Sequence, residues 1–595
     1  MNKCSDNTVW LRTVTLTRSL DAFNRLAVLG VCGTSATYSY DGENRLSGIV
    51  RPEAGAAYRY TNSFVAGYTL TLTNGNVFCR AVGRDPHRQE LTVTVSNFFN
   101  GAFVSGAGYG HDLLGRRTGR VDTVPGSSVT NSFGYNARSE VTNAVQGADN
   151  YAYAYDAIGN RMATTENTKN TEYLANELNQ YTQISVPSVS SVVNPTYDAD
   201  GNMRWDGRMW HTWDAENRLV HSEPGWVGST NGAVRVVNSY DHRHRRIQKR
   251  VEVLAGRGAG YPFDPSQAGT WNTVKTHTFV YDGWNLVLET VAHADGSVDR
   301  IEYVWGLDLS GTLQGAGGVG GLLFEVRNGQ IFIPCYDANG NVTEYVDAAG
   351  NIRAHYEYSP FGEIVVQSGD LADTFKFRFS TKYWDAETRS YYYGYRHYAP
   401  KLGCWLNRDP IGKRGGLNLY CFCGNSPVVF VDGLGMMKGR FGPPKQAPEI
   451  ISHFSHSVFG RLNASLVENS CKCACKKGKY TLSCTLSVVY QISLANENSP
   501  VWSGTAPSSY PSFPTPPDWS KWDYAKKRER TLAHERKHLA AFREWYNGRR
   551  SRIEVFEQLV YPSKDNCQMR RKVLVRENED GWKKKFMEES NHVNW

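Results

Sequence analysis

The stretch Tyr155-Asp156-Ala157-Ile158-Gly159-Asn160-Arg161 sets the pattern for most of this chain. Variants of the same theme, an aromatic residue and Asp followed by Gly or Asn and often Arg, recur on both sides of it. The copies include Tyr40–Leu46, His111–Arg116, Tyr197–Asn202, Trp213–Leu219, Tyr240–Asp241, Tyr281–Asp282 and Tyr336–Asn341. Asp and Asn hydrogen-bond to nearby backbone and Gly or Asn tolerates positive φ, so each copy predicts the turn of a β-hairpin.

Short segments between these turns alternate apolar and polar residues. In one of them Leu91, Val93 and Val95 alternate with Thr92 and Thr94, the period of a strand with one buried face. A single hairpin is marginally stable in water, so the copies must pair into a continuous sheet. The sequence therefore predicts a mostly β protein of stacked hairpins, with a smaller α+β domain at its C-terminal end.

The composition agrees with many short strands and tight turns. The 595 residues include 56 Gly and 34 Tyr, and a chain of this length exceeds a single core. No run of about 18 apolar residues occurs, so we expect no transmembrane segment. The first residues also lack the apolar stretch of a signal peptide. Export would then use another route, or the sequence starts inside a longer gene product.

Charge is distributed unevenly along the chain. Residues 437–595 contain 27 Lys and Arg against 16 Asp and Glu, a net charge of +11. The total is +8, so the preceding residues together carry −3. A basic tail on a faintly acidic body suits an enclosed passenger, and it also suits binding to nucleic acid or a membrane surface. An ordinary solvated basic surface is an equally good interpretation.

The repeated motifs resemble the RHS/YD-repeat family of bacteria, which is related in architecture to teneurins and to shell-forming subunits of insecticidal toxin complexes. The resemblance covers about residues 20–435 and is strongest in one region. There, Tyr356–Gly362, Tyr391–Pro400, Arg408–Gly412 and Gly415–Tyr420 look like the RHS repeat-associated core domain. It implies YD/RHS repeats over residues 1–330, the core domain over 331–436 and a C-terminal effector domain over 437–595.

The family's fold is a long β-sheet wound into a hollow shell around a C-terminal toxin. The repeats here are few for a complete shell. We therefore expect a chain that is incomplete at its N-terminus or that forms only the closing part of a shell.

The resemblance also implies a self-cleavage site. The family's core carries two Asp-Pro-x-Gly motifs, whose aspartates are held responsible for cutting the chain just after the second. The first is intact here at Asp409–Gly412, whereas the second, Asp432–Met436, has Gly433 in place of Pro and Met436 in place of Leu. Two close carboxylates can share a proton while one activates water, and cleavage after Met436 would release residues 437–595. The alternative is that both aspartates only cap turns.

The tail contains the motif His534-Glu535-Arg536-Lys537-His538 within a helical pattern that runs to about Asn547. Two imidazoles one helical turn apart, His534 and His538, can hold one Zn²⁺ ion, with Glu535 as general base. For the third ligand we favour Glu577 on a later helix, followed by Glu579, with His592 also open. The alternative is a charged, solvent-facing helix that carries two histidines.

A cysteine-rich β segment, Leu466–Leu494, precedes this helix. Cys471, Cys473 and Cys475 alternate along one strand, and a tight turn at Lys477-Gly478 would place Cys471 opposite Cys484. The spacing fits a zinc knuckle poorly, so we favour a disulfide or free thiols.

Taken together, the sequence predicts a polymorphic toxin, delivered to a target cell, whose shell encloses a zinc metallopeptidase effector. Such a protein needs a secretion machinery, a protein substrate and an immunity protein as partners. Two alternatives stay open. One is a basic, nuclease-type effector, although no compact metal-nuclease signature or aromatic–basic stacking pattern favours it. The other is a non-enzymatic cell-surface or adhesion protein.

Overall fold

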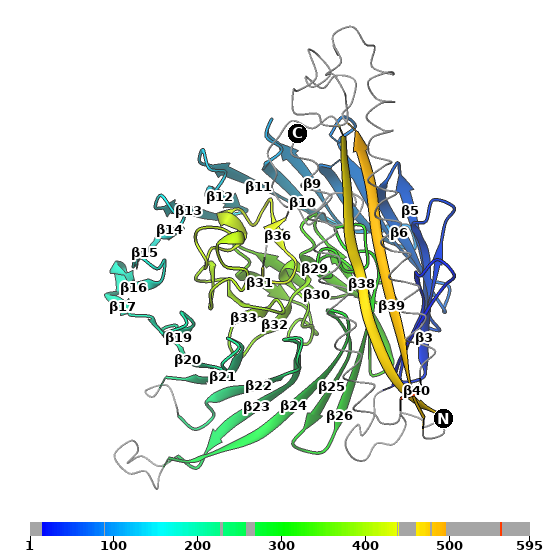
Figure 1. Ribbon diagram of the computed structural model, residues 1–595. Coiled ribbons are helices and arrows are strands. Elements are labelled where there is room, and N and C mark those ends of the chain that lie inside the picture. The colour runs from blue at the N-terminus through cyan, green and yellow to red at the C-terminus, as the bar shows by residue number, and fades with distance from the viewer. Residues whose placement is uncertain are drawn as a thin grey trace, which may run out of the picture. The chain divides into compact units, whose positions relative to one another are not determined.

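The computed structural model describes residues 15–88, 90–225, 230–257 and 268–436, together with the backbone of residues 438–439, 460–476, 479–494 and 560–561. The chain divides into two compact units, residues 1–445 and 446–595, and each is described by itself. The described part of the first unit is built mostly of antiparallel strands, as the sequence predicts (Figure 1). No helix among the described residues is long and apolar enough to cross a bilayer.

A 17-stranded sheet begins the first unit, and each strand pairs antiparallel with the next. Its strands are β1 (Leu16–Leu20), β2 (Leu26–Val31), β3 (Thr34–Tyr40), β4 (Leu46–Val50), β5 (Ala54–Thr61), β6 (Phe64–Leu72), β7 (Val77–Arg84), β8 (Thr92–Phe99), β9 (Ala102–His111), β10 (Arg117–Val124), β11 (Ser127–Tyr135), β12 (Val141–Gln146), β13 (Asp149–Tyr155), β14 (Arg161–Glu166), β15 (Lys169–Ala175), β16 (Tyr181–Val186) and β17 (Ser191–Val193). A short 3₁₀ turn, η1 (Pro187–Val189), joins the last two strands.

A second sheet of 14 strands continues the same up-and-down order. Its strands are β18 (Thr196–Tyr197), β19 (Met203–Trp205), β20 (Met209–Trp213), β21 (Leu219–Pro224), β22 (Val234–Tyr240), β23 (Arg246–Ala255), β24 (Thr270–Asp282), β25 (Asn285–His293), β26 (Val298–Trp305), β27 (Leu322–Arg327), β28 (Gln330–Tyr336), β29 (Val342–Asp347), β30 (Ile352–Tyr358) and β31 (Ile364–Ser368).

The repeated motif forms the turns between these strands, which confirms the prediction. At Asp156, the Oδ1 oxygen accepts hydrogen bonds from the backbone N–H groups of Ile158 (3.0 Å) and Asn160 (2.8 Å). Gly159 supplies positive φ of 89°. In eight other turns, the N–H group four residues after the Asp also donates to its Oδ1, at Asp21, Asp41, Asp112, Asp198, Asp214, Asp241, Asp337 and Asp347.

The Tyr and Arg of the motif connect one turn to the next. The Tyr60 hydroxyl donates to the backbone carbonyl of Leu46 at 2.8 Å. The Arg45 guanidinium lies 4.3 Å from the Tyr60 ring centroid and pairs with Asp41 at 2.8 Å. The same kind of hydroxyl bond to an earlier strand recurs at Tyr40, Tyr135, Tyr155, Tyr240, Tyr281, Tyr336 and Tyr358. The motif therefore encodes both the turn and its attachment to the preceding hairpin.

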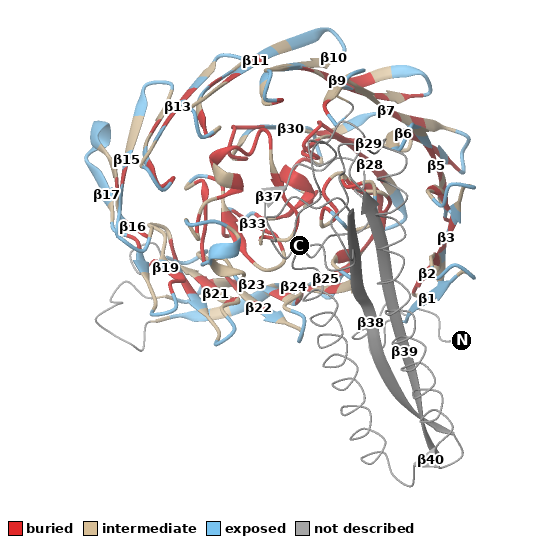
Figure 2. Cartoon of the chain, turned by 45° about the horizontal axis from the view of Figure 1, so that its top comes forward, coloured by how far each residue is buried: buried red, intermediate tan, exposed pale blue. Residues whose placement is uncertain are grey.

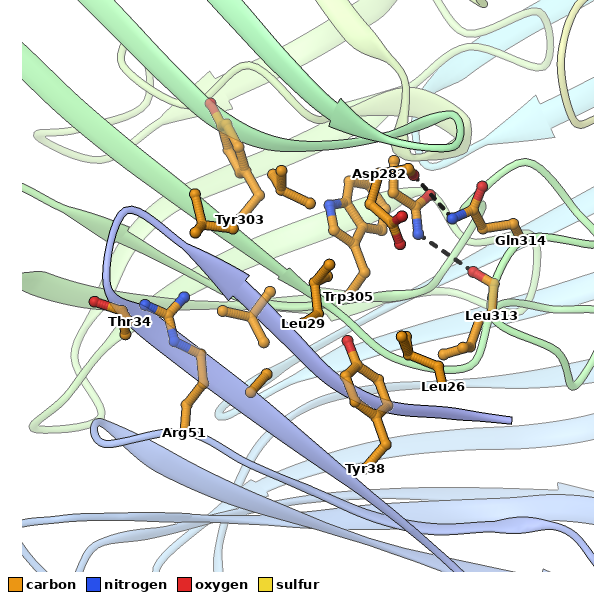
Figure 3. A pocket seen from close by; sticks show the side chains of 15 residues that line it. Leu26, Leu29, Thr34, Tyr38, Arg51, Asp282, Tyr303, Trp305, Leu313 and Gln314 are labelled. Atoms are coloured by element: carbon orange, nitrogen blue, oxygen red, sulfur yellow. Dashed lines mark hydrogen bonds between the residues drawn. The ribbon is translucent and has the colours of Figure 1, made fainter. Parts of the chain in front are cut away.

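The two sheets share a hydrophobic core. The largest cluster of buried side chains takes residues from both, including Leu70 and Phe78 of the first and Leu288 and Tyr345 of the second. Figure 3 shows part of this seam, a cavity between β2–β3 and β24–β26 with Leu26, Tyr38 and Trp305 in its wall. Contact between the sheets thus depends on residues that lie more than 200 positions apart in the sequence.

Residues 369–436, here called the core segment, pack between the sheets (Figure 2). The segment contains a four-stranded sheet of β32 (Tyr383–Asp385), β33 (Ser390–Tyr392), β34 (His397–Ala399) and β35 (Cys404–Trp405), and the 3₁₀ turns η4 (Phe379–Thr381), η5 (Gly412–Arg414) and η6 (Cys423–Asn425). Its last strand, β36 (Val431–Asp432), pairs with β37 (Lys438–Gly439).

Hydrogen bonds attach the core segment to distant hairpins. Asn425 Nδ2 donates to Glu140 Oε1 at 3.0 Å, and the Tyr420 hydroxyl donates to the Gly201 carbonyl at 2.7 Å. Buried side chains dominate this segment in Figure 2, whereas exposed residues gather at the outer hairpins such as β15–β17. Much of the segment is therefore buried, which suits it to hold a precise arrangement of charged groups.

The described backbone of the second unit is a small antiparallel sheet of β38 (Gly460–Lys476), β39 (Lys479–Leu494) and β40 (Val560–Tyr561). Its register pairs Cys471 with Cys484 and Lys476 with Lys479, which confirms the predicted position of the two cysteines. A disulfide between them stays a prediction. The helix predicted to end near Asn547 lies outside the described residues.

Candidate self-cleavage site

The two aspartates predicted for self-cleavage come together on one buried arginine. Asp409 lies in the loop after β35, Asp432 ends β36, and Arg396 immediately precedes β34. Arg396 Nη2 lies 2.8 Å from Asp409 Oδ2 and 3.5 Å from Asp432 Oδ2. The sequence named the two acids but not the cation between them, although Arg396 stands inside one of the quoted core motifs.

Arg396 is itself fixed from several sides. Its Nε donates to the Gly435 carbonyl, its Nη1 donates to the Leu419 carbonyl at 3.2 Å, and its guanidinium lies 4.0 Å from the Trp405 ring centroid. Only 2% of the residue is exposed. A buried guanidinium held this firmly sets the positions of both carboxylates, because each must approach it to satisfy its own charge.

Asp432 also holds the chain that leads to the predicted cleavage point. Its Oδ1 accepts hydrogen bonds from the backbone N–H groups of Leu434 (3.2 Å), Gly435 (2.7 Å) and Met436 (3.1 Å). Gly435 has a φ of +76°, which lets the chain wrap around the carboxylate. The Asp432 carboxylate therefore fixes the backbone of Leu434, Gly435 and Met436, which leads to the predicted cleavage point.

Asp409 and the carbonyl of Met436 both lie beside Gly415. A Cβ atom on Gly415 would overlap Asp409 Oδ2 and would lie 3.1 Å from the carbonyl oxygen of Met436. The carboxylate of Asp409 and the carbonyl of Met436 thus both border the small space that the missing side chain leaves.

Burial raises the pKa of Asp409 and of Asp432 above the ordinary value of 3.8. The charge of Arg396 opposes this rise at both residues, and backbone N–H donors oppose it at Asp432. Because both pKa values are raised, a state in which one carboxyl group is protonated and the other is ionised is populated above pH 3.8. This is the protonation state that paired acid–base catalysis requires.

Lys382 and Gly433 fix the backbone next to the second aspartate, Asp432. Lys382 Nζ donates to the carbonyls of Gly433 (2.6 Å) and Gly317 (2.7 Å), and burial lowers the pKa of this lysine to about 8. A Cβ on Gly433 would lie 2.9 Å from the carbonyl carbon of Ala316. The glycine that replaces the expected proline therefore fits a close backbone approach. No signal in the sequence pointed to Lys382.

The other predicted functional residues, His534, Glu535, His538 and Glu577, lie outside the described residues. Within the described ranges, no group of three or more His, Cys, Asp or Glu side chains is arranged to hold a metal ion. The zinc site of the tail remains a prediction from sequence spacing.

A family model described as "Teneurin YD-shell" matches residues 317–428, which include β27–β35 and Asp409. Among similar proteins, the tRNA3(Ser)-specific nuclease WapA of Bacillus spizizenii is 28% identical over 289 residues, 47% of this chain and 10% of that protein. Double-stranded DNA deaminase toxin A of Burkholderia cenocepacia is 25% identical over 375 residues, 59% of this chain and 24% of that protein.

Among solved structures, a crystal structure of TcdB2-TccC3 is similar with a TM-score of 0.52 and 18% identity. The match covers 71% of this chain and 22% of that one, and it concerns the fold alone. The chain is thus similar to a YD-shell over residues 317–428 and to proteins named as a nuclease and a toxin over longer stretches, and its described part is mostly antiparallel β-sheet. The chain spans only about a tenth to a quarter of the length of the curated relatives described here.

Proposed function

We propose that this chain is the self-cleaving shell region of an RHS-type polymorphic toxin and carries its effector after Met436. The observation that carries the proposal is the meeting of Asp409, Asp432 and Arg396 beside the Met436 carbonyl. The similar proteins support it because WapA is named a nuclease and the Burkholderia protein a toxin. Delivery to a target cell, a secretion machinery and an immunity protein belong to the same proposal.

Hydrolysis would follow the chemistry of paired carboxyl groups. The ionised member of the pair takes a proton from water, whose oxygen attacks the carbonyl carbon of Met436. The protonated member donates its proton as the C–N bond breaks, which leaves a carboxyl group on Met436 and an amine on residue 437. Arg396 keeps the two acids in place and limits the charge that builds up between them.

The test compares the full chain with its Asp409→Asn and Asp432→Asn variants. We expect the unchanged chain to yield a fragment of residues 437–595, identified by intact mass and N-terminal sequence, and both variants to stay whole. Asp373→Asn is the matched control, because Asp373 is an exposed aspartate of the same segment that bonds only to Gln367 in the described structure. Cleavage at the normal rate in both active-site variants would refute the aspartate pair.

For the released tail we propose a zinc metallopeptidase. His534, His538 and Glu577 would hold the metal, and Glu535 would accept a proton from water. Zn²⁺, when bound, supplies an acidified water and a polarised carbonyl. The support is the spacing of the two histidines, inside a segment that the family uses for its effector.

A growth assay of the full chain and its Glu535→Ala and Glu544→Ala variants tests this proposal. We expect Glu535→Ala to lose toxicity, whereas Glu544→Ala keeps it because that glutamate points away from the histidine pair on an unbroken helix. Metal analysis adds a second readout, since His534→Ala should lose zinc. Full toxicity of Glu535→Ala would exclude the peptidase.

A nuclease is the second candidate, favoured by the net charge of +11 on residues 437–595 and by similarity to a protein named a tRNA nuclease. That similarity covers less than half of this chain. Incubation of the released tail with total tRNA and with an unfolded protein separates the two activities.

A further inference from the structure

Two cysteines of the core segment face each other across a pair of strands. Cys404 on β35 and Cys421 form an antiparallel bridge, and the backbone N–H of Trp405 donates to the Tyr420 carbonyl at 3.0 Å beside it. Cys404 and Cys421 are therefore a non-hydrogen-bonded pair, because the hydrogen bond joins the residues that flank them. The Cα atoms of such pairs lie about 4.5 Å apart and their side chains lie close together. Disulfides span Cα separations of about 4.4–6.8 Å.

The surroundings leave room for a bond between the two sulfur atoms. Both cysteines line one small cavity, together with Gly403 and Tyr181. Cys404 is buried and Cys421 is half-buried, so reagents can approach the second thiol first. The nearby Cys423 is buried, and its thiol raises the pKa of Tyr393 and opposes the lowering of the Arg396 pKa.

We propose that Cys404 and Cys421 form a reversible disulfide that fastens both ends of the loop carrying Asp409. The loop between them runs from Trp405 to Tyr420 and presents Asp409 to Arg396. A covalent bond across its base restricts the loop, and therefore holds the carboxylate at the cleavage site. The disulfide stands on the geometry alone, whereas its effect on cleavage rests on the proposed function.

The oxidant would be a small-molecule disulfide such as oxidised glutathione. The Cys421 thiolate attacks one sulfur of it, forms a mixed disulfide and releases one glutathione thiol. The Cys404 thiolate then attacks the Cys421 sulfur and releases the second glutathione. Two protein thiols are oxidised, one glutathione disulfide is reduced to two thiols, and the thiol protons pass to the departing thiolates. Burial raises the pKa of Cys404 to about 12, so we expect the second step to be slow at neutral pH.

Disulfide mapping of the full chain tests the bond itself. The uncleaved Asp409→Asn chain is equilibrated in reduced or oxidised glutathione, alkylated and digested without reduction. We expect a linked pair of peptides containing Cys404 and Cys421 in the oxidised sample only. The Cys423→Ser variant should keep the link and Cys421→Ser should lose it. Separate glutathione adducts, or free thiols, on both cysteines of the oxidised chain would overturn the proposal.

The effect on cleavage is measured separately, by cell-free synthesis of the full chain in reducing and oxidising glutathione buffers. We expect the 437–595 fragment to appear several-fold faster in the oxidising buffer for the unchanged chain, and equally fast in both buffers for Cys404→Ser. If the disulfide is mapped but the fragment forms equally fast in both buffers, the disulfide does not affect cleavage through Asp409. If the unchanged chain produces no fragment in either buffer, the proposed self-cleavage fails, while the peptide map still decides the disulfide.

Discussion

A substitution at Gly415 tests the self-cleavage geometry directly. The backbone φ angle of Gly415 is negative, and alanine adopts it without strain. An added methyl group therefore acts only through the atoms that it contacts. That methyl would overlap Asp409 Oδ2 and approach the Met436 carbonyl. We expect Gly415→Ala to slow formation of the 437–595 fragment by at least about tenfold, since a misplacement of about 1 Å can cost a hundredfold in rate.

Thermal unfolding of the same variant serves as the control for folding. Gly108→Ala is the matched substitution, because a Cβ at Gly108 meets no atom within 4 Å. An unchanged cleavage rate in Gly415→Ala would show that Asp409 does not need its place beside Met436.

The raised pKa values of Asp409 and Asp432 predict a bell-shaped cleavage profile with its maximum above the ordinary aspartate range. Above both values the pair is fully ionised and lacks the proton for the leaving amine, so the rate falls as the pH rises further. Below both values no carboxylate remains to activate water. We expect a maximum above pH 3.8, the ordinary aspartate value. Fragment formation in buffers from pH 4 to 8 measures it.

Substitution of Arg396 tests the assignment of the two carboxyl pKa values in a second way. Arg396 lowers both carboxyl pKa values, so Arg396→Met should move the maximum to higher pH. A profile that stays in place, or moves to lower pH, would contradict the assignment of the titrating groups.

At the scale of single elements, the tyrosine of the motif joins neighbouring hairpins. Tyr60→Phe removes the hydroxyl bond to the Leu46 carbonyl but keeps the ring under Arg45. A neutral hydrogen bond contributes about 1 kcal/mol, so we expect a small loss in the free energy of unfolding of the first unit. Tyr60→Leu, which also removes the cation–π contact, should lose more. Thermal melts followed by circular dichroism at the β-sheet band rank the variants.

Strand β30 carries an ionisation-dependent contact. His355 Nδ1 lies 3.1 Å from Glu344 Oε1 and its Nε2 lies 3.2 Å from Glu357 Oε1, and these bonds raise the pKa of the imidazole from 6.5 to about 9. The resulting stabilisation is complete below pH 6.5 and disappears as the pH rises through 9. We therefore expect the melting temperature to fall between these values in the unchanged chain, and to fall less in His355→Gln. Equal slopes would refute the contact.

For the whole first unit, one ion pair links the two large sheets. Arg51, next to β4, lies 2.6 Å from Glu302 on β26, and both side chains are largely buried (Arg51 is labelled in Figure 3). Breaking a buried pair by removing one partner costs about 3–5 kcal/mol, because the other charge stays buried. Glu302 keeps a second partner, because Arg300 Nη2 lies 2.8 Å from its Oε1. We therefore expect Arg51→Met to destabilise the unit by less than this range, as measured by chemical unfolding.

The double variant Arg51→Met/Glu302→Gln distinguishes an unpaired charge from lost packing. It should recover part of the stability, because it removes the buried charge of Glu302, which has lost one of its two arginine partners. Failure of the second substitution to improve on the first would mean that packing of the arginine stem, and not charge, joins the sheets there.

The amino-acid sequence by itself determined the repeat, the β class and the chemistry of each turn. Those features depend on contacts between residues a few positions apart, as at Asp156, Gly159 and Asn160, and local bonding of that kind is written directly into residue order. The facing positions of Cys471 and Cys484 also followed from counting outward from one turn. Asp409 and Asp432 were named from a resemblance of motifs.

Only the tertiary structure decided what surrounds those aspartates. Arg396, Lys382 and the empty side of Gly415 acquire meaning through contacts across strands and turns that residue order does not reveal. The bridge between Cys404 and Cys421 likewise depends on how the core segment folds back on itself. Long-range packing chooses among many neighbours for each residue, and burial then shifts the charge states of the groups it encloses, so neither could be derived from spacing along the chain.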